Sequence, residues 1–393
     1  MRSLVILRGC PGCGKSTWIK NNKLKNYTLS SDSIRLLVQS PVLGMDGPTI
    51  TQKNDSYVWE LLMELLEKRM QHGDFTVIEA THGYLSEFHR YDQLCEKYCY
   101  KRFYVDFSDV SIETCIEHNK KREAYKRVPD GVIEKIYSRL RTPDKVSGWV
   151  EIDKDKFWDE MGVKLSDFNG YERINIFGDI CGCSNPLKEY FTTFPFSENE
   201  MYIFCGDYVG GGIQNKETLE FLMELSKHKN TLFLEGKSDK CLNYYSLDDD
   251  DENIESKNFL DKFEDIDKKL IRQFYRKLDQ MAYFTFDDQI YFVTHGGLPH
   301  INVNLQLVST EQFIDGVEDE NVNIDEIWAN NNSADKYIQI HGHRNTYEID
   351  DVDELSYNLE GKVESGGNLK VLQIQKGLKP NMVKIKNNAY SAK

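Results

Sequence analysis

The sequence predicts an α/β protein built from two domains. Its 393 residues are about two to three times the usual size of one domain. Strand-like apolar runs alternate with segments of helical apolar spacing, a pattern typical of a parallel sheet with helices on both faces. Hydrophobic residues make up 40% of the chain and charged residues 29%, as in an ordinary globular protein.

The first domain is expected to end near residue 152. Residues 3–7 form a continuous apolar run that leads into a glycine-rich loop, which predicts a buried parallel strand. A helix should begin near Lys15. The further elements predicted here are strands at 27–30, 75–80 and 102–106 and helices at 55–71 and 130–140.

A second series of strand-like runs begins after residue 172, and each run ends in Asp, Gly, Glu or His. Because α/β folds place sites at the carboxyl ends of strands, the pattern predicts an α/β sandwich with polar residues gathered at one edge. The runs lie at 173–179, 201–207, 231–235, 289–294 and 337–341. The predicted organisation is a first domain at 1–152, a connector with a docking helix at 153–172, a second domain at 173–376 and a poorly ordered tail at 377–393.

Composition restricts the classes of function. The formal net charge of −15 argues against long, sequence-independent wrapping of nucleic acid, although it leaves room for gripping one strand end. No apolar run approaches the roughly 20 residues that span a bilayer, so a cytoplasmic location without membrane contact is expected. The nine cysteines lack a disulfide-framework spacing and are expected to be reduced thiols. The acid-rich residues 247–269 predict a solvated surface loop.

Residues 9–17 read Gly-Cys-Pro-Gly-Cys-Gly-Lys-Ser-Thr, which matches the P-loop pattern between a predicted strand and a predicted helix. Glycines let successive N–H groups curve around nucleotide phosphates, while Lys15 reaches the β- and γ-phosphates and Ser16 offers its hydroxyl to Mg²⁺. ATP and Mg²⁺ are therefore the expected cofactors. The expected nucleotide-binding residues are Gly12, Cys13, Gly14, Lys15, Ser16 and Thr17.

A carboxylate and a guanidinium follow the second predicted strand. Asp32 and Arg35 are three residues apart and share one face if a helix starts there. A hydroxyl nucleophile needs a base, and an anionic acceptor needs a fork-shaped cation to orient its phosphate. The pair could supply both, the alternative being that Asp32 is only a helix N-cap and Arg35 is exposed.

A basic stretch at 119–129 precedes the predicted helix at 130–140. As a lid over a triphosphate it would neutralise the charge that develops during transfer and exclude water. As a bare run of charge it would be a solvated helix face. Its position after the fourth predicted strand favours the lid, with Arg122, Lys126 and Arg127 as the candidate cations.

These motifs together resemble the 5′-hydroxyl polynucleotide kinases of phage and of bacterial RNA-repair proteins. The segments that carry the resemblance are the P-loop and residues 31–35, 77–81 and 119–129. The resemblance implies that Asp32 is the general base, that Arg35 contacts the acceptor phosphate and that Arg122 belongs to the lid. The family's second lid arginine falls at Lys126, with Arg127 beside it, and Glu79 stands where an Asp is expected.

Five motifs of the second domain follow the order found in calcineurin-like metallophosphoesterases, which this part of the chain resembles. In bacterial repair proteins such a phosphatase directly follows the kinase. The motifs lie at residues 178–183, 206–212, 235–239, 294–297 and 341–343. The candidate ligands that they retain, for a residual Mn²⁺ or Ni²⁺ site, are Asp179, Asp207, His295, His341 and His343.

Several positions depart from that family pattern. Cys181 takes the place of the first His ligand, Lys237 that of an Asn ligand and Ser238 that of the catalytic His, while Gly210 and Gly211 replace a supporting Asp-Arg pair. Losing a proton donor costs ~10²–10⁴-fold, and losing groups that merely orient a ligand costs ~10–100-fold. A pseudophosphatase domain is therefore predicted, with residual one-metal activity as the alternative.

The predicted function is ATP-dependent phosphorylation of 5′-hydroxyl ends in nucleic-acid repair. The expected partners are single-stranded RNA or DNA 5′ ends, with an RNA or DNA ligase and a second copy of the chain as further candidates. One alternative is a bifunctional 5′-kinase and metal-dependent 3′-end phosphatase. An alternative of another class is a scaffold protein whose P-loop senses nucleotide without catalysis.

Overall fold

A computed structural model describes residues 1–44, 47–140, 146–247, 265–301, 304–319, 321–332, 337–344 and 355–390. Most of the acid-rich segment, residues 248–264, lies outside the described residues. The chain divides into two compact units, and each is considered by itself. The first unit comprises residues 1–163 and 304–310, and the second comprises residues 164–303 and 311–393.

A five-stranded parallel sheet, in the order β2-β5-β1-β6-β7, forms the centre of the first unit. Glu79 of β5 lies opposite both Leu7 of β1 and Ser30 of β2. The carboxyl ends of these three strands therefore meet at one edge of the sheet. The strands are β1 (Ser3–Arg8), β2 (Thr28–Ser30), β5 (Thr76–Glu79), β6 (Lys101–Asp106) and β7 (Val150–Glu151).

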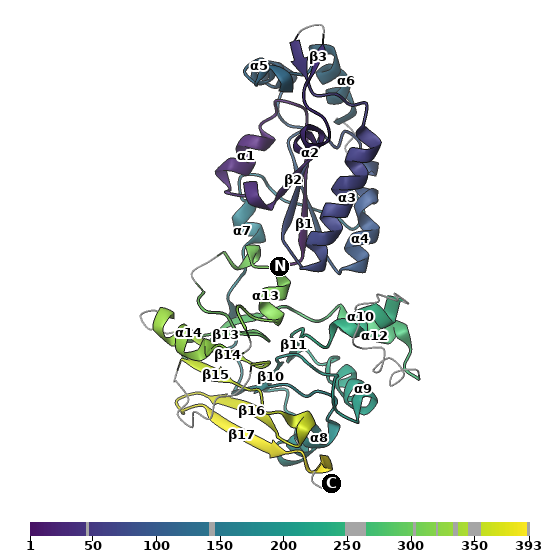
Figure 1. The fold of residues 1–393 in the computed structure, drawn as a ribbon. Coiled ribbons are helices and arrows are strands. Elements are labelled where there is room, and N and C mark those ends of the chain that lie inside the picture. The colour runs from purple at the N-terminus through teal and green to yellow at the C-terminus, as the bar shows by residue number, and fades with distance from the viewer. Residues whose placement is uncertain are drawn as a thin grey trace. The chain divides into compact units, whose positions relative to one another are not determined.

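Helices cover both faces of this sheet because every residue of β1 is buried and successive side chains point to opposite faces. Leu4 and Ile6 belong to one apolar cluster with α3, whereas Val5 and Leu7 belong to another with α1 and α7. Figure 1 shows α1 and α7 on one side of the strands and α3 and α4 on the other. The helices are α1 (Lys15–Asn21), α2 (Ser31–Val38), α3 (Asp55–Gln71), α4 (Asp92–Lys97), α5 (Ile112–Lys120), α6 (Asp130–Leu140) and α7 (Phe157–Met161).

Shorter elements complete the first unit, among them a segment from far along the chain. Residues 304–310, which include the 3₁₀ turn η4 (Leu305–Leu307), pack beside β1. Gln306 donates its side-chain amide to the Ser3 hydroxyl (2.9 Å), and the Thr310 N–H bonds the Gly73 carbonyl (3.1 Å). Nothing in the sequence pattern indicated this return. The remaining elements are the hairpin β3 (Val42–Gly44) and β4 (Gly47–Thr49) and the turns η1 (Lys25–Tyr27), η2 (Leu85–Tyr91) and η3 (Ala124–Lys126).

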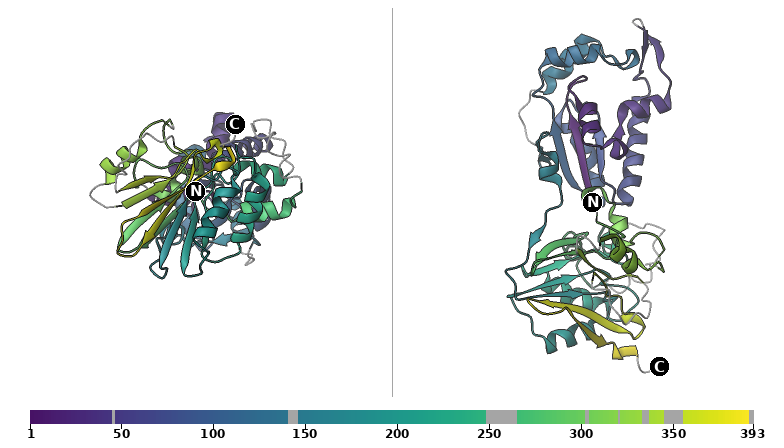
Figure 2. Two further views of the ribbon diagram at one scale, coloured as in Figure 1. Left: turned by 90° about the horizontal axis from the view of Figure 1, so that it is seen from below. Right: turned by 90° about the vertical axis from the view of Figure 1, so that its left-hand side faces the viewer.

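The second unit is a sandwich of two five-stranded sheets, β11-β10-β9-β16-β17 and β15-β14-β13-β12-β8. Side chains from both sheets, such as Ile176 of one and Phe284 of the other, share one apolar core, and Figure 2 shows the two layers. The strands are β8 (Ser166–Asp167), β9 (Arg173–Phe177), β10 (Glu200–Phe204), β11 (Thr231–Phe233), β12 (Ala282–Phe286), β13 (Gln289–Val293), β14 (Tyr337–His341), β15 (Ser356–Asn358), β16 (Asn368–Gln375) and β17 (Asn381–Lys386).

The expectation of a poorly ordered tail from residue 377 is wrong for residues 381–386. They form the edge strand β17, antiparallel to β16, and Ile385 is buried opposite Leu369. The Lys- and Asn-rich composition concealed an alternation that suits an edge strand with one face on the core.

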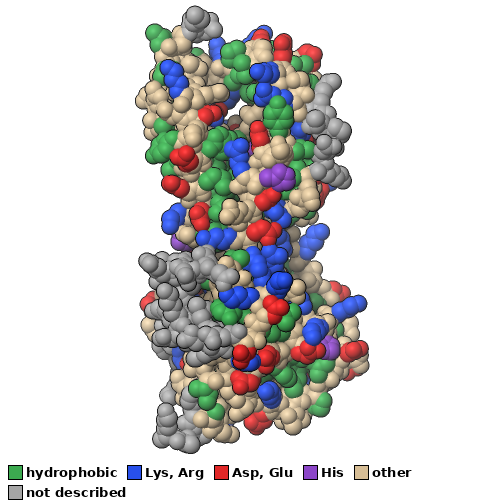
Figure 3. Space-filling view, turned by 90° about the vertical axis from the view of Figure 1, so that its right-hand side faces the viewer, with side chains coloured by type: hydrophobic (Ala, Val, Ile, Leu, Met, Phe, Trp, Pro, Cys, Tyr) green, Lys and Arg blue, Asp and Glu red, His purple; other side chains and the backbone are tan. Residues whose placement is uncertain are grey.

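Helices of the second unit flank the sandwich. They are α8 (Ser184–Thr193), α9 (Asn215–Leu225), α10 (Lys240–Leu247), α12 (Lys268–Tyr275), α13 (Thr310–Ile314) and α14 (Ile324–Asn332), with the 3₁₀ turns η5 (Val363–Ser365) and η6 (Asn388–Tyr390). Within the described part of the chain, every helix is too short or too polar to traverse a bilayer. All nine cysteines are free thiols. Figure 3 shows basic and acidic side chains interspersed on one face of the molecule.

Candidate functional site

The P-loop follows β1 and opens α1, as the motif predicts. Gly14 is the N-cap of α1 with φ 104°, a left-handed conformation that glycine adopts without steric cost. The Lys15 ammonium donates to the carbonyl oxygens of Gly9 (2.5 Å) and Cys10 (2.9 Å). The lysine thus lies back along the loop, with its charge at the position where the motif brings nucleotide phosphates.

Glu79 completes the P-loop end of the site. The Ser16 hydroxyl donates to its carboxylate over 2.5 Å, and the strand register places Glu79 beside the carboxyl end of β1. A hydroxyl and a carboxylate in contact are the oxygen ligands that Mg²⁺ uses beside nucleotide phosphates. Glu79 was noted in the sequence but not counted among the site residues, and its place at a strand end was the available signal.

Asp32 and Arg35 lie on α2, which starts directly after β2. Arg35 Nη1 bonds an Asp32 oxygen (2.8 Å), while Nε and Nη2 bond the two oxygens of Asp55 at 2.8 and 3.2 Å. Burial disfavours the charged guanidinium, but these carboxylates outweigh it and raise the pKa of Arg35. Asp55, at the start of α3, was not recognised from the sequence because its partner lies 20 residues earlier.

The basic stretch 119–129 brings Arg122 to the same carboxylate. Arg122 Nη2 lies 3.7 Å from the second oxygen of Asp32. Lys126 pairs with Glu123 (2.7 Å), and the Arg127 Nε–H bonds the Arg122 carbonyl (2.9 Å). Of these three cations, Arg122 is therefore the one paired with Asp32, and Arg127 supports its backbone.

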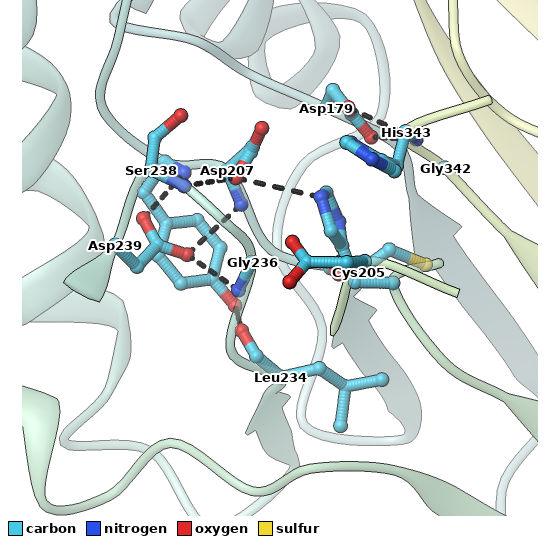
Figure 4. A network of polar contacts seen from close by, with 12 residues as sticks. Asp179, Cys205, Asp207, Leu234, Gly236, Ser238, Asp239, Gly342 and His343 are labelled. Carbon is cyan, nitrogen blue, oxygen red and sulfur yellow. Dashed lines mark hydrogen bonds and ion pairs between the residues drawn. The ribbon is translucent and has the colours of Figure 1, made fainter. Parts of the chain in front are cut away.

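In the second unit, Asp207 lies at the centre of a polar network. One of its oxygens accepts the Ser238 N–H (2.8 Å) and lies 3.4 Å from His295 Nε2. Figure 4 shows it between Ser238 and Asp239 on one side and His343 and Asp179 on the other. Burial alone would raise the pKa of Asp207, but the His295 charge and these donors hold it at about 2.

His295 follows β13 and is fully buried. Its Nδ1 bonds the Cys205 carbonyl (3.0 Å), whereas its buried Nε2 has no hydrogen-bond partner. Burial lowers the pKa of His295, but the carboxylate of Asp207 more than compensates and raises it to about 10. The ring nitrogen that faces Asp207 is thus available either as an imidazolium partner or as a metal ligand.

Asp179 and His343 complete this group. Both Asp179 oxygens accept the His343 N–H, at 3.3 and 3.1 Å. The approach requires glycine at position 342, because a Cβ there would lie 1.9 Å from an Asp179 oxygen. Burial, together with the nearby Glu360 carboxylate, raises the pKa of Asp179 well above its usual range. Glu360 was not recognised from the sequence.

The candidate ligands from the sequence do not all converge. There are two groups of potential ligands among the described residues, and within each group the ligand atoms all lie within 4.8 Å of one another. One group is Asp207, His295 and His343, and the other is Asp179, Cys181 and Asp207. His341 instead bonds Asp325 through Nε2 (3.0 Å) and the Gly342 carbonyl through Nδ1 (2.9 Å). Both ring nitrogens of His341 are used in these hydrogen bonds, and His341 belongs to neither group of potential metal ligands.

These groups suit a divalent metal ion. Asp207 belongs to both, and the buried Nε2 of His295, which faces Asp207 over 3.4 Å without a hydrogen bond, is the kind of polar atom that a metal would satisfy. Lys237, whose charge was expected to repel a cation, is exposed. The geometry therefore gives no support to the predicted loss of phosphatase function, although Ser238 offers a backbone N–H where the family pattern places a catalytic His.

The two units thus have the folds and sites of phosphate-handling proteins, one with a nucleotide-binding P-loop and one with candidate metal-ligand groups. The chain belongs to the calcineurin-like phosphoesterase family, whose model matches residues 172–383. A model described as an AAA domain matches residues 4–143, so a P-loop domain that resembles kinases precedes the phosphoesterase domain.

Two solved structures are similar over part of the chain. A candidate diadenosine tetraphosphatase is 18% identical, covers 56% of this chain and 97% of its own, and has a TM-score of 0.37. A protein serine/threonine phosphatase from Saccharomyces cerevisiae, with similarity to human phosphatase PP5, is 13% identical, covers 56% of this chain and 83% of its own, and has a TM-score of 0.39.

Proposed function

We propose that the first unit transfers the γ-phosphate of ATP to the 5′-hydroxyl end of a single-stranded RNA or DNA. The observation that supports this proposal is that Arg35 and Arg122 both pair with Asp32, which follows β2 directly. Ser30, which ends β2, lies opposite Glu79, and Glu79 bonds Ser16 of the P-loop. Asp32 and Arg35 therefore follow directly from the strand next to the nucleotide-binding residues, and Arg122 approaches Asp32 from the 119–129 stretch.

Each side chain has a defined task in this reaction. The Asp32 side chain is 46% exposed, so an acceptor hydroxyl can reach it and give up its proton. Arg35 is oriented by its two bonds to Asp55 and can hold the acceptor's neighbouring phosphate in a fixed direction. Arg122 approaches from the lid and would neutralise charge that develops on the transferred group.

The residues present fit a Mg²⁺ ion with bound nucleotide. Ser16 and Glu79 would hold it through their side-chain oxygens, and the ion would neutralise charge on the β- and γ-phosphate oxygens. Lys15 adds a positive charge beside the same phosphates and orients them. Lid residues around Arg122 would exclude water, which otherwise competes with the acceptor hydroxyl.

The test is transfer of labelled phosphate from ATP to 5′-hydroxyl oligonucleotides, single-stranded RNA and DNA in parallel. Asp32→Asn keeps the shape of the side chain, removes the base and should lower transfer by ~10²–10⁴-fold. Asp109→Asn is the matched control, because the Asp109 side chain is 64% exposed and forms its ion pair with Lys154, away from Asp32 in the sequence. Transfer that is equal in wild type and Asp32→Asn would contradict the assignment of the base.

A second function is favoured by the converging ligands of the second unit. We propose metal-dependent phosphoester hydrolysis there, which would make the chain a kinase and phosphatase in one. Hydrolysis of p-nitrophenyl phosphate with Mn²⁺ or Ni²⁺ should be measurable and should disappear in Asp179→Ala. Absence of hydrolysis in wild type would favour the pseudophosphatase instead, and ATP binding without transfer would favour a nucleotide sensor.

A further inference from the structure

Cys181, which takes the place of the family's first His ligand, is itself part of the candidate metal site. Its sulfur and oxygen atoms of Asp179 and Asp207 all lie within 4.8 Å of one another. The loop that carries it is fixed, because the Cys181 N–H donates to the Asp207 carbonyl over 2.7 Å. The residue itself has φ 47°, an uncommon value for a side chain other than glycine.

A second observation points to a ligand in the neighbouring group, which shares Asp207 with the Cys181 group. His295 Nε2 is buried without a hydrogen-bond partner and lies 3.4 Å from an oxygen of Asp207, the residue common to both groups. Buried polar atoms almost always have partners. An ion held by the group of Asp207, His295 and His343 would satisfy this nitrogen, and through the shared Asp207 it would lie beside the group that contains the Cys181 thiol.

We propose that Cys181, together with Asp179 and Asp207, binds an ion as a thiolate and that this position therefore prefers a thiophilic divalent metal, such as Zn²⁺, over Mg²⁺ or Mn²⁺. Thiolate and imidazole ligands suit Zn²⁺, whereas carboxylate, carbonyl and water oxygens suit Mg²⁺ and Mn²⁺. Coordination forms a metal–sulfur bond and releases the thiol proton to solvent. The proposal concerns the second unit alone and does not depend on the proposed kinase reaction.

Titration of the full chain with Co²⁺ provides a test that does not use activity. A thiolate ligand gives a sulfur-to-cobalt charge-transfer band in the near ultraviolet, which wild type should show and Cys181→Ser should lose. Cys183→Ser is the matched control. Its thiol lies two residues away, bonds the Cys181 carbonyl and belongs to neither group of described ligand atoms, so this variant should keep the band.

Cys181→His separates loss of the thiol from loss of the fold. It supplies the imidazole that the family pattern has at this position, so metal binding should persist while the preference for Zn²⁺ over Mn²⁺ falls by about tenfold or more. Binding of Co²⁺ by wild type without the band, persistence of the band in Cys181→Ser, or no binding by wild type would each overturn the proposal. An unchanged metal preference in Cys181→His would do the same.

Discussion

The two candidate sites handle charge in different ways. In the first unit, Asp32 and Arg122 form a pair whose side chains are 46% and 25% exposed, so water screens them and they can rearrange around an incoming phosphate. In the second unit, Asp207 and His295 are buried, and a charge there must be compensated by a fixed partner. The first site therefore suits a charged substrate that binds and dissociates, whereas the second suits a charge that is bound permanently.

The largest effect is expected from removal of the Asp207 carboxylate, which both ligand groups of the second unit share. Asp207→Asn should lower metal affinity by about 100-fold or more, because even groups that only orient a ligand are worth ~10–100-fold. Asn is the suitable replacement since Asp207 has φ 51°, a region that Asn tolerates. Isothermal titration with Zn²⁺ and Mn²⁺ checks this expectation.

The same variant should leave phosphate transfer by the first unit unchanged. A parallel fall in kinase activity would show that the two sites are coupled, and unchanged metal affinity would place the ion elsewhere. Asp287→Asn serves as the control, because Asp287 also has a positive φ of 50° but is exposed and precedes β13, whereas His295 follows that strand.

A smaller effect is expected at the metal-binding end of the first site. Glu79→Gln keeps a hydrogen-bond acceptor for Ser16 but removes the negative charge, so transfer should fall by ~10–100-fold and more Mg²⁺ should be required. Measuring transfer across a Mg²⁺ series checks this. Glu96→Gln, on an exposed side chain that pairs with Arg102, should retain wild-type Mg²⁺ dependence, and an identical response of both variants would argue against a role for Glu79.

Local motifs in the sequence were enough to predict the central strands and the P-loop. The predicted helix at 55–71 is α3, Asp55–Gln71, because apolar spacing and a polar start are properties of adjacent residues. The resemblance to polynucleotide kinases also assigned Asp32, Arg35 and Arg122 to one site, and Arg35 and Arg122 both lie beside Asp32. Motif order likewise brought Asp179, Asp207, His295 and His343 into one neighbourhood.

What the sequence could not show depends on contacts between distant residues. Asp55 holds Arg35 across 20 positions, and residues 304–310 return to the first unit from beyond several strands of the second. The pairing of His341 with Asp325 is equally invisible in a motif. Sequence patterns record which side chains face one side of an element, whereas these partners are selected by tertiary packing.

Two buried histidines give the finest comparison between the units. His82, in the first unit, has both ring nitrogens in hydrogen bonds, to the Leu7 carbonyl (2.9 Å) and the Tyr91 hydroxyl (3.0 Å). Burial lowers the pKa of His82 to about 3, and positive charges on Arg90, Lys15 and Arg8 contribute further. The carboxylate of Asp207 raises the pKa of His295, whereas the charges of Arg90, Lys15 and Arg8 act with burial to lower the pKa of His82.

Acid should therefore weaken the first unit. The unfolded chain binds a proton at His82 below about pH 6.5, while the folded chain resists it down to about pH 3, so stability is complete above pH 6.5 and is lost as the pH falls. Between pH 7 and pH 5 this amounts to about 2 kcal/mol. Hydrogen exchange of peptides covering β1, corrected for the intrinsic effect of pH, measures the loss.

His82→Asn should destabilise the first unit at neutral pH, because a buried ring is lost, yet should flatten this pH dependence. Asn is compatible with the φ of 46° at this position. His89→Asn is the control, since the His89 side chain is 60% exposed and its removal should leave the acid-induced loss in place. A pH dependence of β1 exchange that survives His82→Asn unchanged would assign the acid sensitivity to another group and remove the contrast between the two buried imidazoles.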